Sequence, residues 1–310
     1  MVEGAQRRTS GLVALFGAAT VLGLFGVCAR LAEPGFSPTA QTVVRFLLAA
    51  GVIAAAGAAR GRRLRLARPA VPQVIALGIG TCGLGVLFTL AVSETRVATA
   101  VSLLFGASLV TALLVGTVLL AEPLTPAKLA ITTLALAGLA VHAAGPGALG
   151  AGALAALGAG VTDGACNGLR KRLRAEAHDA VVLGQYVTGA LCALPLLLFV
   201  DTAPITSPDA RSAGALACFG LLSAVLGGLL MYGFARFDVN VGSVILASQV
   251  FFAMLLAALL LDEAPAWHEA AGAALIFAAA SGAVIASDPR SRERGHDPAA
   301  APGDSVLRSP

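Results

Sequence analysis

An aspartate stands inside a long apolar stretch of the sequence, in the segment GVTDGACNGL at residues 160–169. Asn167 follows Asp163 by four residues, which places both side chains on one face of a helix. A charged group at the centre of a bilayer costs about 2.5–3.5 kcal/mol on insertion scales, so it requires a partner, water or a proton. Asp163 is therefore a candidate for contacting a substrate amine or carrying a proton, with Asn167 as a neutral hydrogen-bonding neighbour. The alternatives are a structural ion pair and a carboxylate directed towards the basic cluster Arg170–Arg174.

Small residues next to Asp163 indicate which way this aspartate faces. A row at four-residue spacing lies beside Asp163 and Asn167, and it consists of Gly152, Ala156, Gly160, Gly164 and Gly168. Rows of this kind allow helix backbones to approach closely in membranes. We therefore predict that this row packs on another helix and keeps the neighbouring polar row inside the bundle.

Other polar residues inside apolar runs could line a cavity. Arg45 lies roughly 10 Å from the nearer end of its run, at ~1.5 Å per residue. Its guanidinium fork suits a substrate carboxylate, and the alternative is a clamp to a neighbouring helix or to backbone carbonyls. Five more candidates for hydrogen bonding in a cavity, or else between helices, are Gln185, Tyr186, Tyr232, Ser248 and Gln249. Three hydroxyl residues are expected only to pack, namely Ser102, Ser108 and Thr111.

Two glutamates close apolar runs at related places in the sequence. Glu122 and Glu263 are each followed by a short loop and the start of another run. An acidic side chain is favourable near the positive N-terminal end of a helix dipole. We interpret both glutamates as structural caps, and gating is the alternative.

These residues must be positioned by membrane-spanning helices. The chain has 310 residues, of which 57% are hydrophobic and 12% charged, with a mean hydropathy of +0.86. Soluble domains average about 25% charged residues, so the composition is typical of a membrane protein. Runs of about 20 apolar residues suit helices, because lipid offers no partner to an unpaired backbone. We predict an all-α membrane protein with ten helices, at 11–31, 39–59, 72–92, 97–120, 127–144, 149–169, 180–200, 213–234, 239–261 and 266–286.

The basic residues predict the orientation of these helices. With both termini in the cytoplasm, the cytoplasmic segments hold 17 of the 21 lysines and arginines. The positive-inside rule favours this arrangement, and it makes lipid rather than nucleic acid the partner of the basic runs. Residues 1–10 are then a cytoplasmic N-terminus, and residues 288–310 are predicted to be a disordered cytoplasmic tail.

The sequence contains a repeat. VLLAEPLTPAKLAITTLALAGLAVHAA at 118–144 resembles LLLDEAPAWHEAAGAALIFAAASGAVI at 259–285, at an offset of nearly half the chain. We call two positions repeat-related when the offset from Val118 to Leu259 separates them. Each copy would hold five helices, in residues 11–144 and 149–287. Five is an odd number, so the second copy must enter the membrane from the opposite side. Inverted repeats of this kind occur in many secondary transporters, with the substrate site near the midplane.

These features resemble the EamA domains of the drug/metabolite transporter superfamily. The resemblance rests on PTAQTVVRFLLAA (38–50), on SETRVATAVSLL (93–104) and on the glutamates that close the fourth and ninth helices. It implies a bacterial-type inner-membrane carrier of small metabolites, often amino acids and often an exporter, with a cavity lined by helices one to four and six to nine. Family members often have a proline midway along the fourth and ninth helices; this chain has none at 105–111 or 247–253, which removes the basis for a kink there.

We therefore expect a secondary transporter in the plasma membrane that exports small polar metabolites, such as amino acids, by alternating access. The alternatives are a multidrug or nucleotide-sugar-like carrier and, in another class, an intramembrane enzyme. No phosphate-binding loop is present, so we do not expect ATP-driven transport by this chain alone. No histidine lies beside Asp163 at matching depth and no metal-ligand spacing occurs, so we expect no enzyme. Five cysteines lie in apolar runs without ligand spacing, and no metal or cofactor is expected. Protons are a candidate coupling ion, and an oligomer is compatible with the sequence.

Overall fold

The chain is all-helical in the residues that its computed structural model describes, which are 2–62, 64–142, 144, 150–199, 201, 203–262 and 264–286. The helices are α1 (Val2–Ala32), α2 (Pro38–Ala59), α3 (Val71–Glu94), α4 (Val97–Leu114), α5 (Pro126–His142), α6 (Ala151–Arg172), α7 (His178–Phe199), α8 (Ala210–Phe234), α9 (Val239–Ala247), α10 (Gln249–Leu260) and α11 (Trp267–Ala286). A π-helical turn at Val115–Leu119 continues α4. The predicted tail at 288–310 and Glu263 lie outside the described residues.

Each of the ten predicted runs coincides with helical structure, but eight segments of the described chain are long and apolar enough to cross a membrane. The two runs that fall short are α5 and α6. Helix α5 is apolar but has 17 residues. Helix α6 has 22 residues, and its polar row and three basic residues in the last turn lower its hydropathy. The polar residues that are candidates for function, Asp163 and Asn167, therefore help to make α6 less apolar than the other long helices.

Several helix ends differ from the predicted ones. Helix α1 begins at Val2 rather than at residue 11. Helix α6 ends at Arg172 rather than at 169, so that Arg170 belongs to the helix and not to a loop. Helix α8 begins with a capping box, in which the Asp209 carboxylate accepts a hydrogen bond of 2.7 Å from the Ser212 backbone N–H. This bond and the Ser212 side chain hold the pKa of Asp209 below its usual value.

The ninth predicted run is broken, although it contains no proline. Helices α9 and α10 are separated at Ser248. The Ser248 N–H and hydroxyl both donate to the carbonyl of Ile245, at 3.2 and 2.7 Å, in place of the regular helical bond. Bonding of a serine to the preceding turn bends helices. The predicted run at 239–261 is therefore one apolar span, Val239–Leu260, whose helix is interrupted at the single residue Ser248 without a proline.

The bundle differs from a soluble protein in its exposed apolar surface and in the polar side chains within its largely apolar core. Buried polar residues include Arg45, Gln185 and Gln249. Large apolar side chains are exposed on the outside of the bundle, such as Phe199 at 84% and Val118 at 74%. Trp267, at the start of α11, is also exposed, as expected of an interfacial anchor. A surface of this kind is suited to lipid.

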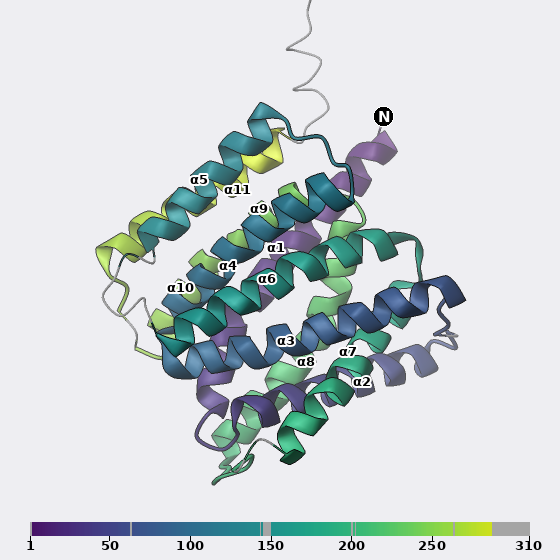
Figure 1. The fold of residues 1–310 in the computed structure, drawn as a ribbon, viewed down its shortest axis with the longest axis vertical. Helices are drawn as coiled ribbons and strands as arrows, with labels where there is room; N and C mark the ends of the chain where they lie inside the picture. Colours follow the sequence, from purple (N-terminus) through teal and green to yellow (C-terminus); the bar gives the residue numbers. More distant parts are fainter. Residues whose placement is uncertain are drawn as a thin grey trace, which may run out of the picture.

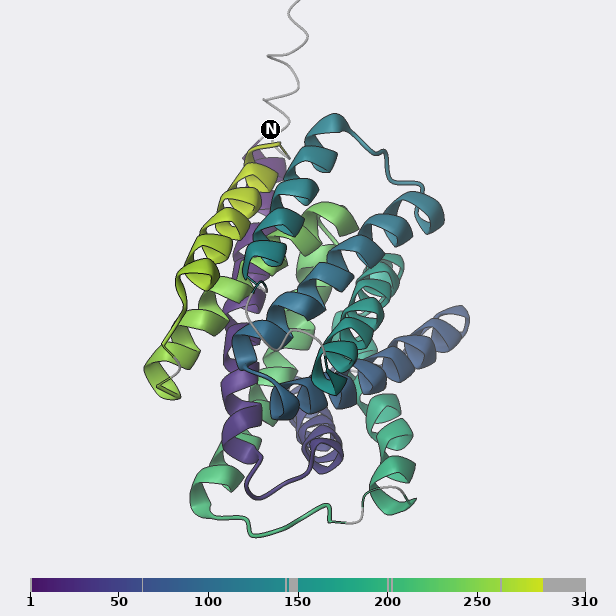
Figure 2. The same ribbon diagram turned by 60° about the vertical axis from the view of Figure 1, so that its left-hand side comes forward.

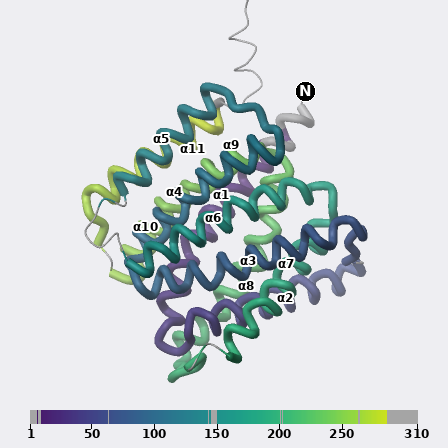
Figure 3. The backbone as a smooth tube through the Cα atoms, in the orientation of Figure 1, coloured from purple at the N-terminus to yellow at the C-terminus, as the bar shows by residue number. Residues whose placement is uncertain are grey.

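The two halves of the chain interlock (Figures 1 and 3). Helix α6 lies between α3 and α4, and correspondingly α1 packs on α8 and α10. Helix α5 packs along α11 at one edge of the bundle, where both lie side by side after the molecule is turned (Figure 2). Helix α2 packs on α7. Each contact of one half with the other is therefore matched by a contact of the corresponding helices: α6 with α3 and α4 corresponds to α1 with α8 and α10, and the pairs α2–α7 and α5–α11 correspond to themselves. The backbone repeats in detail too, because the repeat-related residues Ala121 and Asp262 both have positive φ angles, of 51° and 54°.

The small-residue row of α6 packs on α4, as its spacing predicted. A Cβ at Gly160 would overlap the carbonyl oxygen of Leu104 and lie 2.7 Å from the Cβ of Ala107. A Cβ at Gly164 would lie 2.7 Å from the carbonyl oxygen of Ser108. Only glycine allows the two backbones to come this close. The contact holds the adjoining row, with Asp163, against the interior.

Candidate functional site

A cavity of about 70 Å³ lies among the helices of both halves. Repeat-related residues face it together, for example Arg45 with Tyr186, and Phe105 with Leu246. The lining residues are Leu22, Phe25, Arg45, Phe46, Thr81, Leu84, Gly85, Phe88, Leu104, Phe105, Asp163, Arg170, Gln185, Tyr186, Ser223, Leu226, Leu230, Leu246 and Gln249.

Asp163 is held by a compact polar network. Its Oδ2 accepts hydrogen bonds from Ser108 at 2.7 Å and from Asn167 at 3.2 Å. Arg170 lies with Nη1 3.9 Å from the Asp163 Oδ1 and donates to the Asn167 side-chain oxygen at 2.5 Å. Asn167 is buried behind Asp163 and is not among the residues that line the cavity. The carboxylate therefore has a cationic partner of its own, and the network still borders the cavity.

Arg45 is buried at the cavity among aromatic rings. Its guanidinium carbon lies 4.2 Å from the ring centre of Phe219, 4.8 Å from that of Phe46 and 5.8 Å from that of Phe25. Rings at these distances attract a guanidinium through their negative faces. On the open side stands Gly85, where a Cβ would lie 2.6 Å from the Arg45 Nη2. This glycine gives the guanidinium its room.

The two cavity glutamines each have a side-chain oxygen without a hydrogen-bond partner in the described structure, and both oxygens are buried. Gln185 comes from α7, and Gln249 is the first residue after the break at Ser248. Tyr186 also lines the cavity, and its hydroxyl donates to the Ser223 carbonyl at 2.5 Å. Both glutamines line the cavity, so rotation of either side chain would present its unbonded oxygen to N–H or O–H groups of a ligand.

Besides Asn167, two further predicted candidates lie away from the cavity lining. The Tyr232 hydroxyl donates to Ser10 at 3.0 Å, and the Tyr232 ring is covered by the guanidinium of Arg236 at 3.3 Å. Ser248 is buried, and its hydroxyl bonds its own helix. Ser248 directly precedes Gln249, which lines the cavity.

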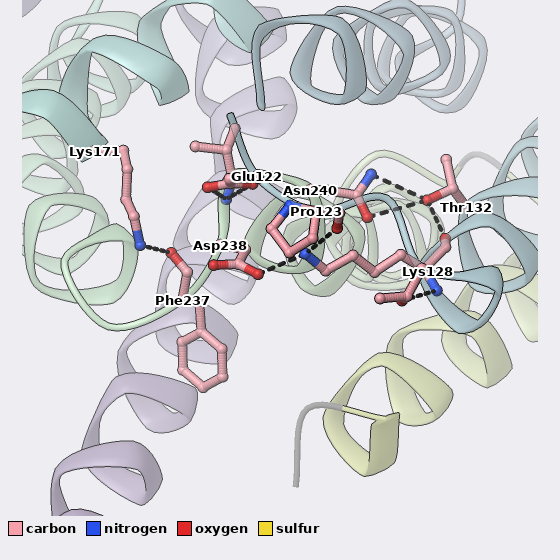
Figure 4. Close-up of polar contacts among 10 residues, drawn as sticks. Glu122, Pro123, Lys128, Thr132, Lys171, Phe237, Asp238 and Asn240 are labelled. Atoms are coloured by element: carbon pink, nitrogen blue, oxygen red, sulfur yellow. Dashed lines mark hydrogen bonds and ion pairs between the residues drawn. The ribbon is translucent and has the colours of Figure 1, made fainter. Parts of the chain in front are cut away.

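Glu122 caps a helix, but not the one that follows it. Its carboxylate oxygens accept from the Val239 N–H at 2.9 and 3.1 Å, at the start of α9 (Figure 4). In the same place the buried Lys128 donates to the Asp238 carboxylate at 2.6 Å and to the Pro123 carbonyl at 2.9 Å. We call Glu122, Lys128 and Asp238 the Lys128 junction. It joins the first half of the chain to the second.

A second junction between the halves lies where α4 and α11 begin. Arg96 Nη1 lies 2.9 Å from Glu269 Oε1, and Arg96 Nη2 donates to the Ala264 carbonyl at 3.2 Å. Glu269 is buried, and it also accepts from the Ala266 N–H at 2.7 Å. We call Arg96 and Glu269 the Arg96 junction.

Sequence reasoning missed two contributors to the site. The first is Ser108, which is expected only to pack but donates to Asp163; the available signal is that Ser108 and Gln249 are repeat-related. Arg170 is not one of them, because it belongs to the basic cluster given above as the alternative partner of Asp163, and it is buried beside that carboxylate. The aromatic rings around Arg45 could not be found, because Phe25 and Phe219 are distant in sequence. No group of three or more metal-ligating side chains occurs among the described residues.

Apolar helices around a cavity with charged side chains define a multi-pass membrane protein. The family model of the EamA-like transporter family matches residues 9–143 and again residues 150–285, and the chain belongs to this family. The two matches show that the family's unit occurs twice. A solved structure described only as "Crystal structure of protein" is 25% identical, with a TM-score of 0.75, over 92% of this chain and 99% of its own. No curated protein matches the chain.

Proposed function

We propose that this protein is a secondary transporter in which ten helices form two inverted five-helix repeats, at 11–144 and 149–287, and work by alternating access. The cavity supports this proposal, because both halves line it with repeat-related residues. The exchange pattern of helix contacts supports it too. In inverted-repeat carriers, the substrate site lies between the repeats near the midplane, and rocking of one against the other exposes it to each side.

The proposed orientation has both termini in the cytoplasm and the protein in the plasma membrane. The excess of arginine and lysine in the corresponding segments supports it. The Lys128 junction then faces the cytoplasm, and the Arg96 junction faces the outside. Export of small polar metabolites, with amino acids as the first candidates, is the direction and class that the family resemblance implies.

Asp163 carries the proposal for proton coupling. It is the carboxylate among the cavity-lining residues, and it lies next to a cation that it could release when it takes up a proton. A proton on Asp163 would free Arg170 to bind a solute, and loss of that proton would restore the pair. Occupancy by solute and by proton would then be linked.

We expect that Asp163→Asn removes the dependence of transport on pH. The measurement is uptake of a radiolabelled amino-acid mixture into proteoliposomes with and without an imposed pH gradient. Acceleration by the gradient should fall about tenfold in Asp163→Asn and survive in Asp163→Glu. The double variant Asp163→Asn/Arg170→Gln should behave as Asp163→Asn, since neither contains the carboxyl group.

Asp179→Asn is the control, because this acid is outside the cavity and pairs with Arg62 at 3.1 Å. It should keep the wild-type response to the gradient. A gradient response of wild-type size in Asp163→Asn would exclude this carboxylate as the proton carrier. Absence of uptake above protein-free liposomes, for every amino acid, would argue against this substrate class.

A further inference from the structure

Arg45 is a buried cation without a polar partner. Only 3% of the residue is exposed, and no side chain or carbonyl of the described chain forms a hydrogen bond or an ion pair with it. Phe25, Phe46 and Phe219 surround the guanidinium, and its remaining open direction is the cavity. Buried arginines normally face a carboxylate or another acceptor, because an unpaired buried charge is costly. The missing acceptor must therefore come from what the cavity holds.

The charge balance of the cavity indicates the net charge of that ligand. Its charged lining residues are Arg45, Arg170 and Asp163. Asp163 is already engaged by Arg170, Ser108 and Asn167. One positive charge remains, and it is the one on Arg45. A ligand with one negative charge would neutralise the cavity, whereas a cation would meet an occupied carboxylate.

The walls indicate the rest of the ligand. Most of the lining side chains are leucine or phenylalanine, and Phe46, Phe88 and Phe105 are among them. Walls of this kind favour an apolar or aromatic body. The free oxygens of Gln185 and Gln249 add places for a neutral hydroxyl or N–H group.

We propose that the transported solute is an organic monocarboxylate with an apolar body, whose carboxylate pairs with Arg45. This inference rests on the proposed function, and it narrows the substrate class from small polar metabolites to monoanions. A free amino group is then unnecessary for binding, since the acid that would receive it is paired within the protein.

Three compounds share a phenylethyl body but differ in the charge of the ligand. They are 3-phenylpropionate, an anion, phenylalanine, a zwitterion, and phenethylamine, a cation. Their dissociation constants are measured by titration calorimetry on the full chain in lipid nanodiscs. We expect 3-phenylpropionate to bind at least about tenfold more tightly than phenethylamine, and more tightly than phenylalanine. Tightest binding of phenethylamine or phenylalanine would overturn the proposal, as would absence of binding by all three.

Variants of the arginine test its role. Arg45→Gln should weaken 3-phenylpropionate about tenfold or more and leave phenethylamine unchanged, and Arg45→Lys should retain part of the affinity. Gly85→Ala keeps the charge but crowds the Arg45 Nη2, so it should weaken the same compound. Arg236→Gln is the matched control, since Arg236 also stacks on a ring but does not line the cavity, and it should change nothing. Equal affinity in Arg45→Gln and the wild type would contradict the proposal.

The same preparation in proteoliposomes distinguishes this inference from the proposed function. Uptake of phenethylamine or phenylalanine in preference to 3-phenylpropionate would support the proposed transport function and reject the monocarboxylate as its substrate class. Tight, Arg45-dependent binding without uptake would reject transport and keep the binding site.

A second, independent inference comes from the two junctions. Lys128 and Glu269 are repeat-related, and Asp238 lies one position after the residue that is repeat-related to Arg96. Each junction is therefore the repeat counterpart of the other. The charges are exchanged, however. The first half supplies both cations, Lys128 and Arg96, and the second half supplies both anions, Asp238 and Glu269. Both ion pairs therefore cross between the halves, while Glu122, the third member of the Lys128 junction, accepts from the Val239 N–H.

We infer that the junctions are two latches, each of which holds one end of the cavity closed and breaks when that end opens. Lys128 and Glu269 are buried in their pairs, so separation of a pair leaves a charge that must become hydrated. Water reaches that charge only when the end of the bundle opens. Loss of the Lys128 pair should therefore favour opening towards the cytoplasm, and loss of the Arg96 pair should favour opening towards the outside.

The test uses one reporter cysteine, Ser223→Cys, in a variant without the five native cysteines. Ser223 lines the cavity. A small membrane-impermeant thiol reagent is applied from either side of oriented vesicles, with exposed Ala177→Cys and Ser207→Cys as markers of the two sides. Lys128→Met should raise the rate of labelling from the cytoplasmic side about fivefold or more, and Arg96→Met should raise it from the outside.

Arg62→Met is the matched control, because the Arg62–Asp179 pair also joins the halves but is exposed, and it should leave both rates unchanged. The exchange Lys128→Asp/Asp238→Lys should restore the wild-type rates. Changes on the same side in Lys128→Met and Arg96→Met, no change in either, or failure of the exchange to restore the rates would overturn the latch inference.

Discussion

Replacement of Gly160 by alanine is expected to destabilise the protein more than any other single-methyl addition in α6. The added carbon would overlap the Leu104 carbonyl oxygen and crowd Ala107, and the overlap is with backbone, which cannot rotate away. Overpacking costs about 1–3 kcal/mol in ordinary cores, and we expect the upper end or more here. The consequence is separation of α6 from α4, and with it loss of the position of Asp163.

Thermal unfolding of the purified protein, followed by size-exclusion chromatography, measures this effect. Gly106→Ala in α4 is the control, because a Cβ there meets nothing within 4 Å. The transition temperature should fall by several degrees in Gly160→Ala, at roughly 2–4 °C per kcal/mol, and remain near wild type in Gly106→Ala. Equal stability of the two variants would mean that the close contact of α4 and α6 is not needed for the fold.

Asp163→Asn is expected to lower stability more than Arg170→Gln, and the double variant should recover part of the loss. Removal of one partner from a buried pair costs about 3–5 kcal/mol, because the other charge is left without compensation. The two losses differ, since an unpaired carboxylate can take up a proton whereas a guanidinium stays charged. Arg170 is 2% exposed, so water gives it little compensation.

A double-mutant cycle on unfolding temperatures tests this asymmetry. Residues in contact show interaction energies of about 0.5–3 kcal/mol, and the pair of Asp163 and Arg170 should fall in that range. Strict additivity of the two single variants, or a greater loss in Arg170→Gln than in Asp163→Asn, would show that the two side chains do not form a functional pair.

The helices and their repeat could be predicted from the sequence because they depend on local patterns. Apolar runs, the small-residue row of α6 and the constant offset between the two copies are all visible without coordinates. The direction of Asp163 followed from that row, which packs on α4, and Asp163 is buried at the cavity. Arg45 and the two glutamines were also visible, because polar side chains are rare in such runs.

What could not be predicted depends on contacts between distant segments. The break at Ser248 arises from a serine bonding its own helix, for which proline was the expected signal. The partner of Glu122 is the start of α9, 117 residues away, and no pattern near Glu122 indicates it. The basic cluster Arg170–Arg174 was visible as a possible partner of Asp163, but only burial distinguishes Arg170 from its neighbours.

The most direct measurement is labelling of the Ser223→Cys reporter with both junctions intact. If two oppositely inserted halves expose one binding pocket to each side in turn, the thiol should react with an impermeant reagent applied from either face, and a bound solute should slow both reactions. A thiol reached from a single face under every condition, with or without solute, would contradict transport through this cavity.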